Sequence, residues 1–206
     1  MTKTAKLCAL LFACVIVVTA GCGSKKAKTP KEAVVNLTEA IEDGNKGLFM
    51  ANVHCDDKEL AEAMFDGMVA MRSFTEKFEK EYGKDKAGEF SKMRQPSAEE
   101  VAEKVKIEEK GDKATARMPD EGPMNLIKQE GYWKVDMSEL AKQDQSGQMK
   151  EMMKRMATAA KKAEDKVGKD EYKDKPGKII SELMTEVTGV DMEKMMKEMG
   201  DAMQPE

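Results

Sequence analysis

Two eight-residue segments of the chain carry methionine at the same four positions. MKEMMKRM occupies residues 149–156, and MEKMMKEM occupies residues 192–199. Thioether sulfur is a soft ligand, so such a cluster could bind copper(I) in an oxidising compartment where free thiols are scarce. The candidate ligands are Met149, Met152, Met153, Met156, Met192, Met195, Met196 and Met199.

Methionine at this spacing is also an ordinary feature of an amphipathic helix. Residues three, four and seven apart share one helix face, methionine favours helices, and its flexible side chain fills irregular gaps. Neither segment contains His or Cys, and both apolar stripes continue in Ala, Val, Ile or Leu. We therefore favour a packing face and predict no metal site and no cofactor, with copper(I) binding as an alternative. Contact with a partner protein stays open, because surface and core stripes look the same in sequence.

The only histidine, His54, stands next to Cys55. Neighbouring side chains point to different sides of a helix, so the two make a poor metal pair and a poor nucleophile–base couple. A general base also needs a group that orients it, and the chain has no second histidine to build another pair. We predict no catalytic residue here and a protein that is not an enzyme.

The first 21 residues predict an export signal. MTKTAK is basic, and the apolar run Leu7–Ala20 that follows is too short to cross a bilayer, which takes about 20 residues. Thr19-Ala20-Gly21-Cys22 resembles a bacterial lipoprotein signal, in which a cysteine after small residues is acylated and becomes the new first residue. The resemblance implies lipidation at Cys22, palmitate-type acyl chains, and a location in the bacterial cell envelope on the periplasmic or extracellular side.

Charge and cysteine content agree with an exported protein that does not bind nucleic acid. The formal net charge is −4, and it becomes −6 when Lys3 and Lys6 leave with the signal. Lysines alternate with glutamates along the predicted helices, as on a solvated surface, which excludes nucleic acid as a partner. Once Cys8 and Cys14 are removed and Cys22 is acylated, Cys55 alone remains, so no internal disulfide can form.

Residues 22–29 predict an acylated cysteine and a polar, basic tether. After it, four segments have helix-start signals. Thr29 to Glu32 forms a capping box with Pro30 at the first helical position, and the helix ends at Gly44. Asn45 begins a short helix, Asp56-Asp57-Lys58-Glu59 begins a long one that ends at Gly83, and Ser97 begins one more turn. Residues 84–95 read as irregular.

The hydrophobic period then changes from 3.6 to 2. Four strands are expected near 105–108, 114–118, 124–129 and 132–135, joined by turns at Gly111 and Gly131. Two consecutive hairpins form an antiparallel meander that needs a helical layer on one face. We expect the long helix and the helix after Thr29 to supply it, which gives an α+β fold.

This order of elements resembles the nuclear-transport-factor-2-like superfamily, in particular the domain of unknown function found in bacterial lipoproteins. The resemblance implies a cone-like domain at residues 30–137, with a pocket where catalytic relatives place an acid or base. Here the inward positions are Ala114, Ala116, Met118, and Leu126 or Ile127. The resembling residues are Pro30, Val34, Leu37, Ala40, Gly44, Asn45, Gly111, Asp112, Ala114, Leu126, Gly131, Trp133, Lys134 and Val135.

Residues 138–206 form a Met/Lys/Glu-rich helical extension that holds ten of the 19 methionines. Its two helices, separated by the charged loop 168–177, could pair with each other, pack on the cone, or present a surface to an envelope protein. The leading hypothesis is a membrane-anchored lipoprotein that acts as a non-enzymatic binding or structural module. A small-ligand carrier or isomerase-like cone enzyme is the first alternative, and copper(I) binding by the helices is the second.

Overall fold

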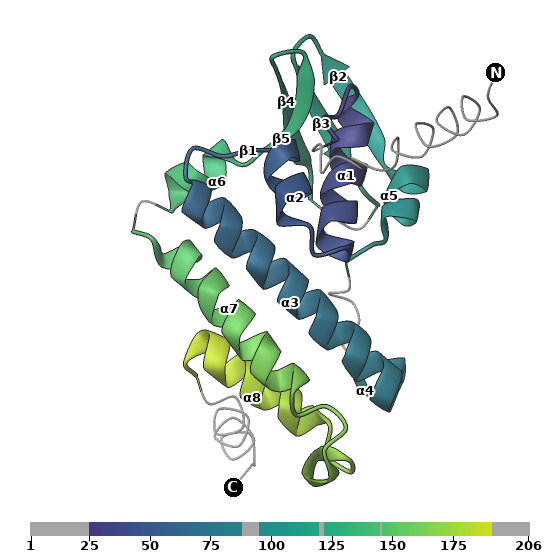
Figure 1. The fold of residues 1–206 in the computed structure, drawn as a ribbon, viewed down its shortest axis with the longest axis vertical. Helices are drawn as coiled ribbons and strands as arrows, with labels where there is room; N and C mark the ends of the chain where they lie inside the picture. Colours follow the sequence, from purple (N-terminus) through teal and green to yellow (C-terminus); the bar gives the residue numbers. More distant parts are fainter. Residues whose placement is uncertain (1–24, 88–94, 120–121, 145, 191–206) are drawn as a thin grey trace, which may run out of the picture.

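The computed structural model describes residues 25–87, 95–119, 122–144 and 146–190, and over these ranges the fold is α+β (Figure 1). The predicted signal, Cys22 and the second methionine segment lie outside the described residues. No helix in the described ranges is both long enough and apolar enough to cross a membrane.

The sheet contains the predicted meander and one further strand. Its order is β1-β5-β4-β3-β2, and the four strands β2 to β5 pair antiparallel as expected. The two-residue strand β1 pairs parallel with β5, so the sheet is mixed rather than purely antiparallel. The strands are β1 (Val53–His54), β2 (Lys106–Lys110), β3 (Lys113–Arg117), β4 (Met124–Gln129) and β5 (Tyr132–Asp136).

Helices α1 (Pro30–Glu42) and α2 (Lys46–Asn52) cover one face of the sheet, and the short helix α5 (Ala98–Lys104) packs beside α1. Their predicted starts are confirmed. Thr29 and Ser97 each complete a capping box, with Glu32 and Glu100 respectively, and the Asn45 side chain accepts from the backbone N–H of Leu48. Each cap accepts a hydrogen bond from a backbone N–H of the first turn, which has no partner within the helix.

The long helix α3 (Lys58–Tyr82) does not cover the sheet as expected. It packs against α1 and α2 on one side and against α7 on the other, which places it one layer further out. Its first half supplies Ala61 and Phe65 to the sheet core. Its second half supplies Phe74 and Phe78 to a separate helical core, so one helix joins two cores. The helix is therefore buried on two sides.

The extension forms α6 (Ser138–Gln143), α7 (Gln148–Glu164), a 3₁₀ helix (Asp170–Tyr172) and α8 (Gly177–Thr188). Lys150 of α7 bonds Glu59 near the start of α3, and Lys77 near its end bonds the Glu164 carbonyl, so α3 and α7 run parallel. Lys162 pairs with Glu186 and Lys166 with Glu182, so α8 runs antiparallel to α7. Of the arrangements left open for the tail helices, the described residues show α7 pairing with α8, and α7 also packs on α3.

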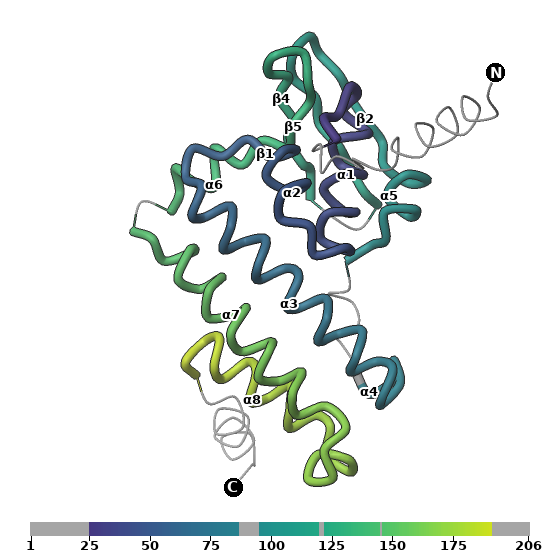
Figure 2. The backbone as a smooth tube through the Cα atoms, in the orientation of Figure 1, coloured from purple at the N-terminus to yellow at the C-terminus, as the bar shows by residue number. Residues whose placement is uncertain are grey.

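The parallel strands β1 and β5 explain the parallel helices. The chain leaves β1 directly into α3 and leaves β5 through α6 into α7, as the tube in Figure 2 shows. Two neighbouring strands that point the same way thus deliver two helices to the same side of the molecule. Sheet and helical core lie at opposite ends of the long axis (Figure 1).

Two segments expected to be irregular are ordered in part. Residues 84–87 form α4 (Lys84–Ala87) rather than loop, while 88–94 lie outside the described residues. The tether is also shorter than expected. Ala27 is buried and forms an antiparallel bridge with Trp133, whose N–H donates to the Ala27 carbonyl at 2.9 Å. Part of the predicted tether, from Lys25, therefore belongs to the fold.

Candidate functional site

The first methionine segment packs against α3. A Cβ placed on Gly67 would lie 3.0 Å from the Met156 methyl, 3.3 Å from the Met153 carbonyl and 3.6 Å from the Met153 sulfur. Because Gly67 lacks a side chain, α7 approaches α3 closely here and the methionines fill the space above it. Met153 and Met156 are half-buried at this contact.

The remaining candidate ligands are not gathered at this contact. Met152 is 45% exposed. Met149 is half-buried at the first turn of α7, where its backbone N–H donates to Asp144 at 2.7 Å. Met192, Met195, Met196 and Met199 lie outside the described residues. The four described methionines thus lie along one face of α7 but differ in burial, from the half-buried Met153 and Met156 to the exposed Met152, and copper(I) binding stays an alternative.

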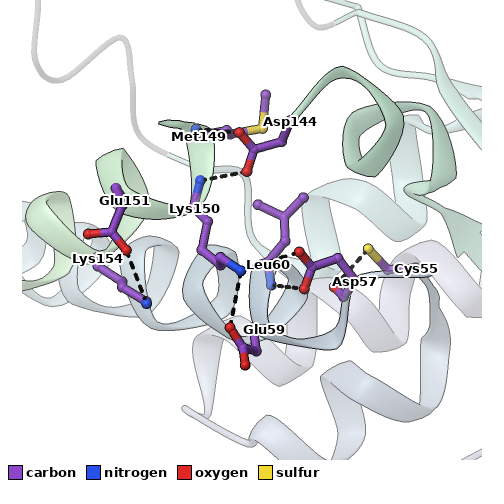
Figure 3. Close-up of polar contacts among 9 residues, drawn as sticks. All are labelled: Cys55, Asp57, Glu59, Leu60, Asp144, Met149, Lys150, Glu151 and Lys154. Atoms are coloured by element: carbon purple, nitrogen blue, oxygen red, sulfur yellow. Dashed lines mark hydrogen bonds and ion pairs between the residues drawn. The ribbon is translucent and has the colours of Figure 1, made fainter. Parts of the chain in front are cut away.

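The starts of α3 and α7 meet at a charged junction, formed by Asp57, Glu59, Asp144 and Lys150 (Figure 3). Asp57 caps α3 by accepting from the Leu60 N–H at 3.0 Å. Asp144 caps α7 by accepting from the N–H groups of Met149 and Lys150. The Lys150 ammonium then bridges the helices, at 3.1 Å from Glu59 Oε2 and 3.5 Å from Asp57 Oδ2.

The pKa shifts at this junction follow from those contacts. The Leu60 N–H is the main cause that lowers the pKa of Asp57, and Lys150 adds to it. The hydrogen bond to Glu59 is the main cause that raises the pKa of Lys150. Both shifts favour the charged forms, as expected for helix caps and ion pairs. Asp57 and Lys150 are thus held in their charged forms, as a cap and an ion pair require.

An open groove of about 690 Å³ lies beside this junction. Its charged side chains balance, with three carboxylates against three ammonium groups. No group of three His, Cys, Asp or Glu side chains in the described part of the chain is arranged to hold a metal ion. The groove therefore has the chemistry of a solvated helix junction. The lining residues are Asp56, Asp57, Lys58, Glu59, Ala141, Lys142 and Lys150.

His54 and Cys55 lie at the edge of the sheet, not on a helix, and they point to different partners. His54 Nε2 lies 3.3 Å from the Gln129 side-chain nitrogen, whereas Cys55 Sγ donates to the Asp57 carbonyl at 3.1 Å. Burial is the main cause that raises the pKa of the Cys55 thiol, and nearby acids, including Asp136, raise it further. Only a thiolate is a strong nucleophile, so Cys55 is held in its less reactive form.

Apolar side chains fill the space between sheet and helices. Trp133 and Leu126 from the sheet and Phe49 from α2 are at most 2% exposed, and the rings of Phe49 and Phe65 lie 5.1 Å apart. Ala114, Ala116 and Leu126 face the helices, as the sequence predicts, and Met118 packs at the edge of this core. Ile127 belongs to the other face, because it follows the inward-facing Leu126 and side chains alternate along a strand; its partner on β5 is Lys134.

The buried polar side chains of the described residues serve the fold, and two of them fix the start of the chain. Asn52 is fully buried and donates to the carbonyls of Lys25 at 3.0 Å and Leu48 at 2.9 Å. Asn36 donates to the same Lys25 carbonyl at 3.3 Å and to the Asn52 side chain at 3.2 Å. Thr75 donates to the Met71 carbonyl within α3.

Glu79 on α3 has one poorly satisfied oxygen. Its Oε1 atom is shielded from solvent and has no hydrogen-bond partner among the described residues, although the residue as a whole is half-buried. An unpaired shielded oxygen costs free energy, so this atom is expected to lower the stability of the helical core.

Sequence reasoning missed three of these features. The Gly67 contact has a sequence signal in the small residues Ala63, Gly67 and Ala70, which share one helix face. Asn36 is a polar residue within an apolar helix face, which signals a buried hydrogen bond. The bridge from Lys150 to Glu59 has no local signal, because it joins distant segments.

Comparison of the chain with protein-family models, with curated proteins and with solved structures found no match.

Proposed function

We propose that this protein is a bacterial envelope lipoprotein, anchored through acylated Cys22, that acts as a non-enzymatic module for contact with another envelope protein. In this proposal residues 1–21 are the removed signal. The sheet with α1, α2 and α5 is a small cone-like domain of the nuclear-transport-factor-2-like kind, and the helical extension is the part that meets the partner.

The observation that carries the proposal is the way α7 and α8 are attached. They form a second core with the outer half of α3, at the end of the molecule opposite the start of the described chain (Figure 1). A protein whose first residue is held by lipid would therefore carry these helices away from the bilayer. Met152 at 45% exposure and Val190 at 46% are the large apolar side chains exposed within the described residues, and both belong to this part.

The filled space beneath the sheet counts against the small-ligand alternative. A carrier or isomerase needs a cavity lined by a few converging polar groups. Here Trp133, Leu126 and Phe49 occupy that space, and the buried amides Asn36 and Asn52 are committed to the chain start.

The test is photo-crosslinking in intact cells. A photoreactive residue replaces Val190 in one strain and Glu109, exposed on strand β2, in a matched control strain. The proposal expects a discrete crosslinked protein from position 190 and none from position 109. Identical patterns, or none from position 190, would contradict it. Truncation after Leu140 is a poorer test, because it would expose Phe74 and Phe78 of α3.

A further inference from the structure

The start of the described chain is fixed firmly to the domain. The Lys25 carbonyl accepts from both buried amides, Asn36 at 3.3 Å and Asn52 at 3.0 Å. Two residues later, Ala27 is 1% exposed and bridges to Trp133. Buried amide donors that lose their acceptor cost about 1–3 kcal/mol each. The backbone is therefore part of the fold from Lys25 onward.

This attachment leaves very little free chain after the anchor. Cys22 and Lys25 are three residues apart, and three residues span at most about 10 Å even when fully extended. A flexible tether of 20 or more residues would let the body turn freely, whereas this connection cannot. If Cys22 carries lipid, the surface around Lys25 must stay within about 10 Å of the headgroups.

That surface is basic, although the chain as a whole is acidic. Residues 25–32 carry four lysines and one acid, whereas the whole chain has a net charge of −4. The side chain of the acid, Glu32, is used in capping, accepting from the N–H groups of Lys28 and Thr29. We call Lys25, Lys26, Lys28 and Lys31 the lysine collar, and all four are exposed.

Lys26 of the collar and one further lysine, Lys128, lie over aromatic rings of β5. Lys26 lies 4.8 Å from the centre of the Tyr132 ring, and Lys128 lies 5.8 Å from that of Trp133. Nearby acids include Glu39, paired with Lys25 at 3.2 Å, Asp112, whose backbone carbonyl accepts from the Lys128 N–H, and Glu130 in the turn between Lys128 and Tyr132. A lysine close to an anionic bilayer gains about 1 kcal/mol, so the collar favours contact with anionic headgroups.

We infer that the protein lies on the bilayer in one orientation, with the lysine collar and the β2–β3 turn against anionic headgroups and the helical core pointing away. This inference rests on the proposed lipid anchor at Cys22. We assign a lipid surface as the partner of the collar, because the chain between the anchor and Lys25 is short and the collar is positively charged. The short connection and the docked Lys25 restrict the tilt, and the collar selects which side meets the lipid.

Energy transfer from the acylated protein to a headgroup acceptor tests the inference. The vesicles contain phosphatidylglycerol and phosphatidylethanolamine. One donor dye sits at Asp112→Cys, on the turn beside the collar. A matched dye sits at Asp174→Cys, in the loop before α8 at the opposite end of the long axis (Figure 1). Both variants carry Cys55→Ser, so each has one reactive thiol. The inference expects several-fold higher transfer from position 112 than from position 174.

Two perturbations make the result specific. Inserting about 20 Gly and Ser residues before Lys25 adds a flexible chain of about 25 Å, and it should lower transfer from position 112 towards that of 174. Reversing the charge of the collar with Lys26→Glu and Lys28→Glu should also lower it. The control reversal, Lys173→Glu and Lys175→Glu, lies in the far loop and should leave transfer from position 112 unchanged.

Mass spectrometry of the same sample separates the possible failures. An acylated Cys22 with equal transfer from positions 112 and 174 overturns the inference and leaves the lipid anchor intact. An insertion that leaves transfer from position 112 unchanged also overturns it. An unmodified Cys22 overturns the proposed function and the inference together.

Discussion

Replacing Gly67 by alanine tests whether the methionines of α7 act as packing residues. Alanine in place of a helical glycine is worth about 1 kcal/mol in intrinsic helix stability. Here, however, the new Cβ would lie 3.0 Å from the Met156 methyl and 3.3 Å from the Met153 carbonyl. Such overpacking costs about 1–3 kcal/mol. We therefore expect Gly67→Ala to lower the free energy of unfolding by about 1 kcal/mol.

A second substitution isolates the contact. In a Met156→Ala background the nearest obstructing atom is gone, so Gly67→Ala should become neutral or stabilising. The expected coupling energy between the two positions is about 1–2 kcal/mol, within the range seen for residues in contact. Both free energies come from urea unfolding followed by circular dichroism, with constant m-values as a check that the denatured state is unchanged.

The matched control is Gly47→Ala in α2. A Cβ there would meet nothing closer than the Asn45 side-chain oxygen at 3.5 Å, an ordinary contact. This substitution should stabilise the protein by up to about 1 kcal/mol and add independently to Met156→Ala. The packing account is wrong if Gly67→Ala and Met156→Ala are also additive to within about 0.3–0.5 kcal/mol.

Three further predictions concern single side chains. Hydrogen bonding from Lys166 lowers the pKa of Glu182. Replacing Glu182 by Gln should therefore lower the free energy of unfolding by about 1 kcal/mol at pH 7. This loss should fade as the pH falls below about 4.3, the ordinary pKa of a glutamate. The measurement is the urea midpoint of the wild type and of Glu182→Gln at a series of pH values. A difference between the two midpoints that persists at pH 3 would contradict the prediction. Glu79→Leu should raise the free energy of unfolding by about 1 kcal/mol by removing the unpaired oxygen, and a lower midpoint would refute this. Cys55 should react with iodoacetamide more slowly in the folded protein than in urea at pH 8, and equal rates would show that burial does not protect it.

The sequence predicted those parts of the fold that depend on neighbouring residues. The capping boxes at Thr29 and Ser97 each need only the next three residues, and both form. The turns at Gly111 and Gly131 each use a glycine at a positive φ angle, and in the second turn Glu130 has a positive φ as well. Helix starts and hairpins can therefore be predicted from the sequence alone.

What the sequence could not predict depends on distant residues. Val53 and His54 form a strand only because β5 lies beside them, and two residues are too few to show alternation. The parallel course of α3 and α7 follows from that pairing and has no local sign. The chain start looked like a free tether because the two amides that hold Lys25 come from α1 and α2.

The candidate site was predicted only in part, because its contacts also depend on residues distant in sequence. Spacing correctly placed Met153 and Met156 on one face of a helix, but it could not say what that face meets. Gly67 supplies the answer, and a glycine within a helical pattern otherwise reads only as a cost. The exposure of Met152 shows that the same spacing holds both packing and surface residues.

Intact-mass analysis of the mature protein, extracted from membranes, tests the central claim most directly. The account predicts a chain that begins at Cys22 and carries a diacylglyceryl group on its sulfur. A chain that begins at any other residue, or that begins at Cys22 without lipid, would contradict it.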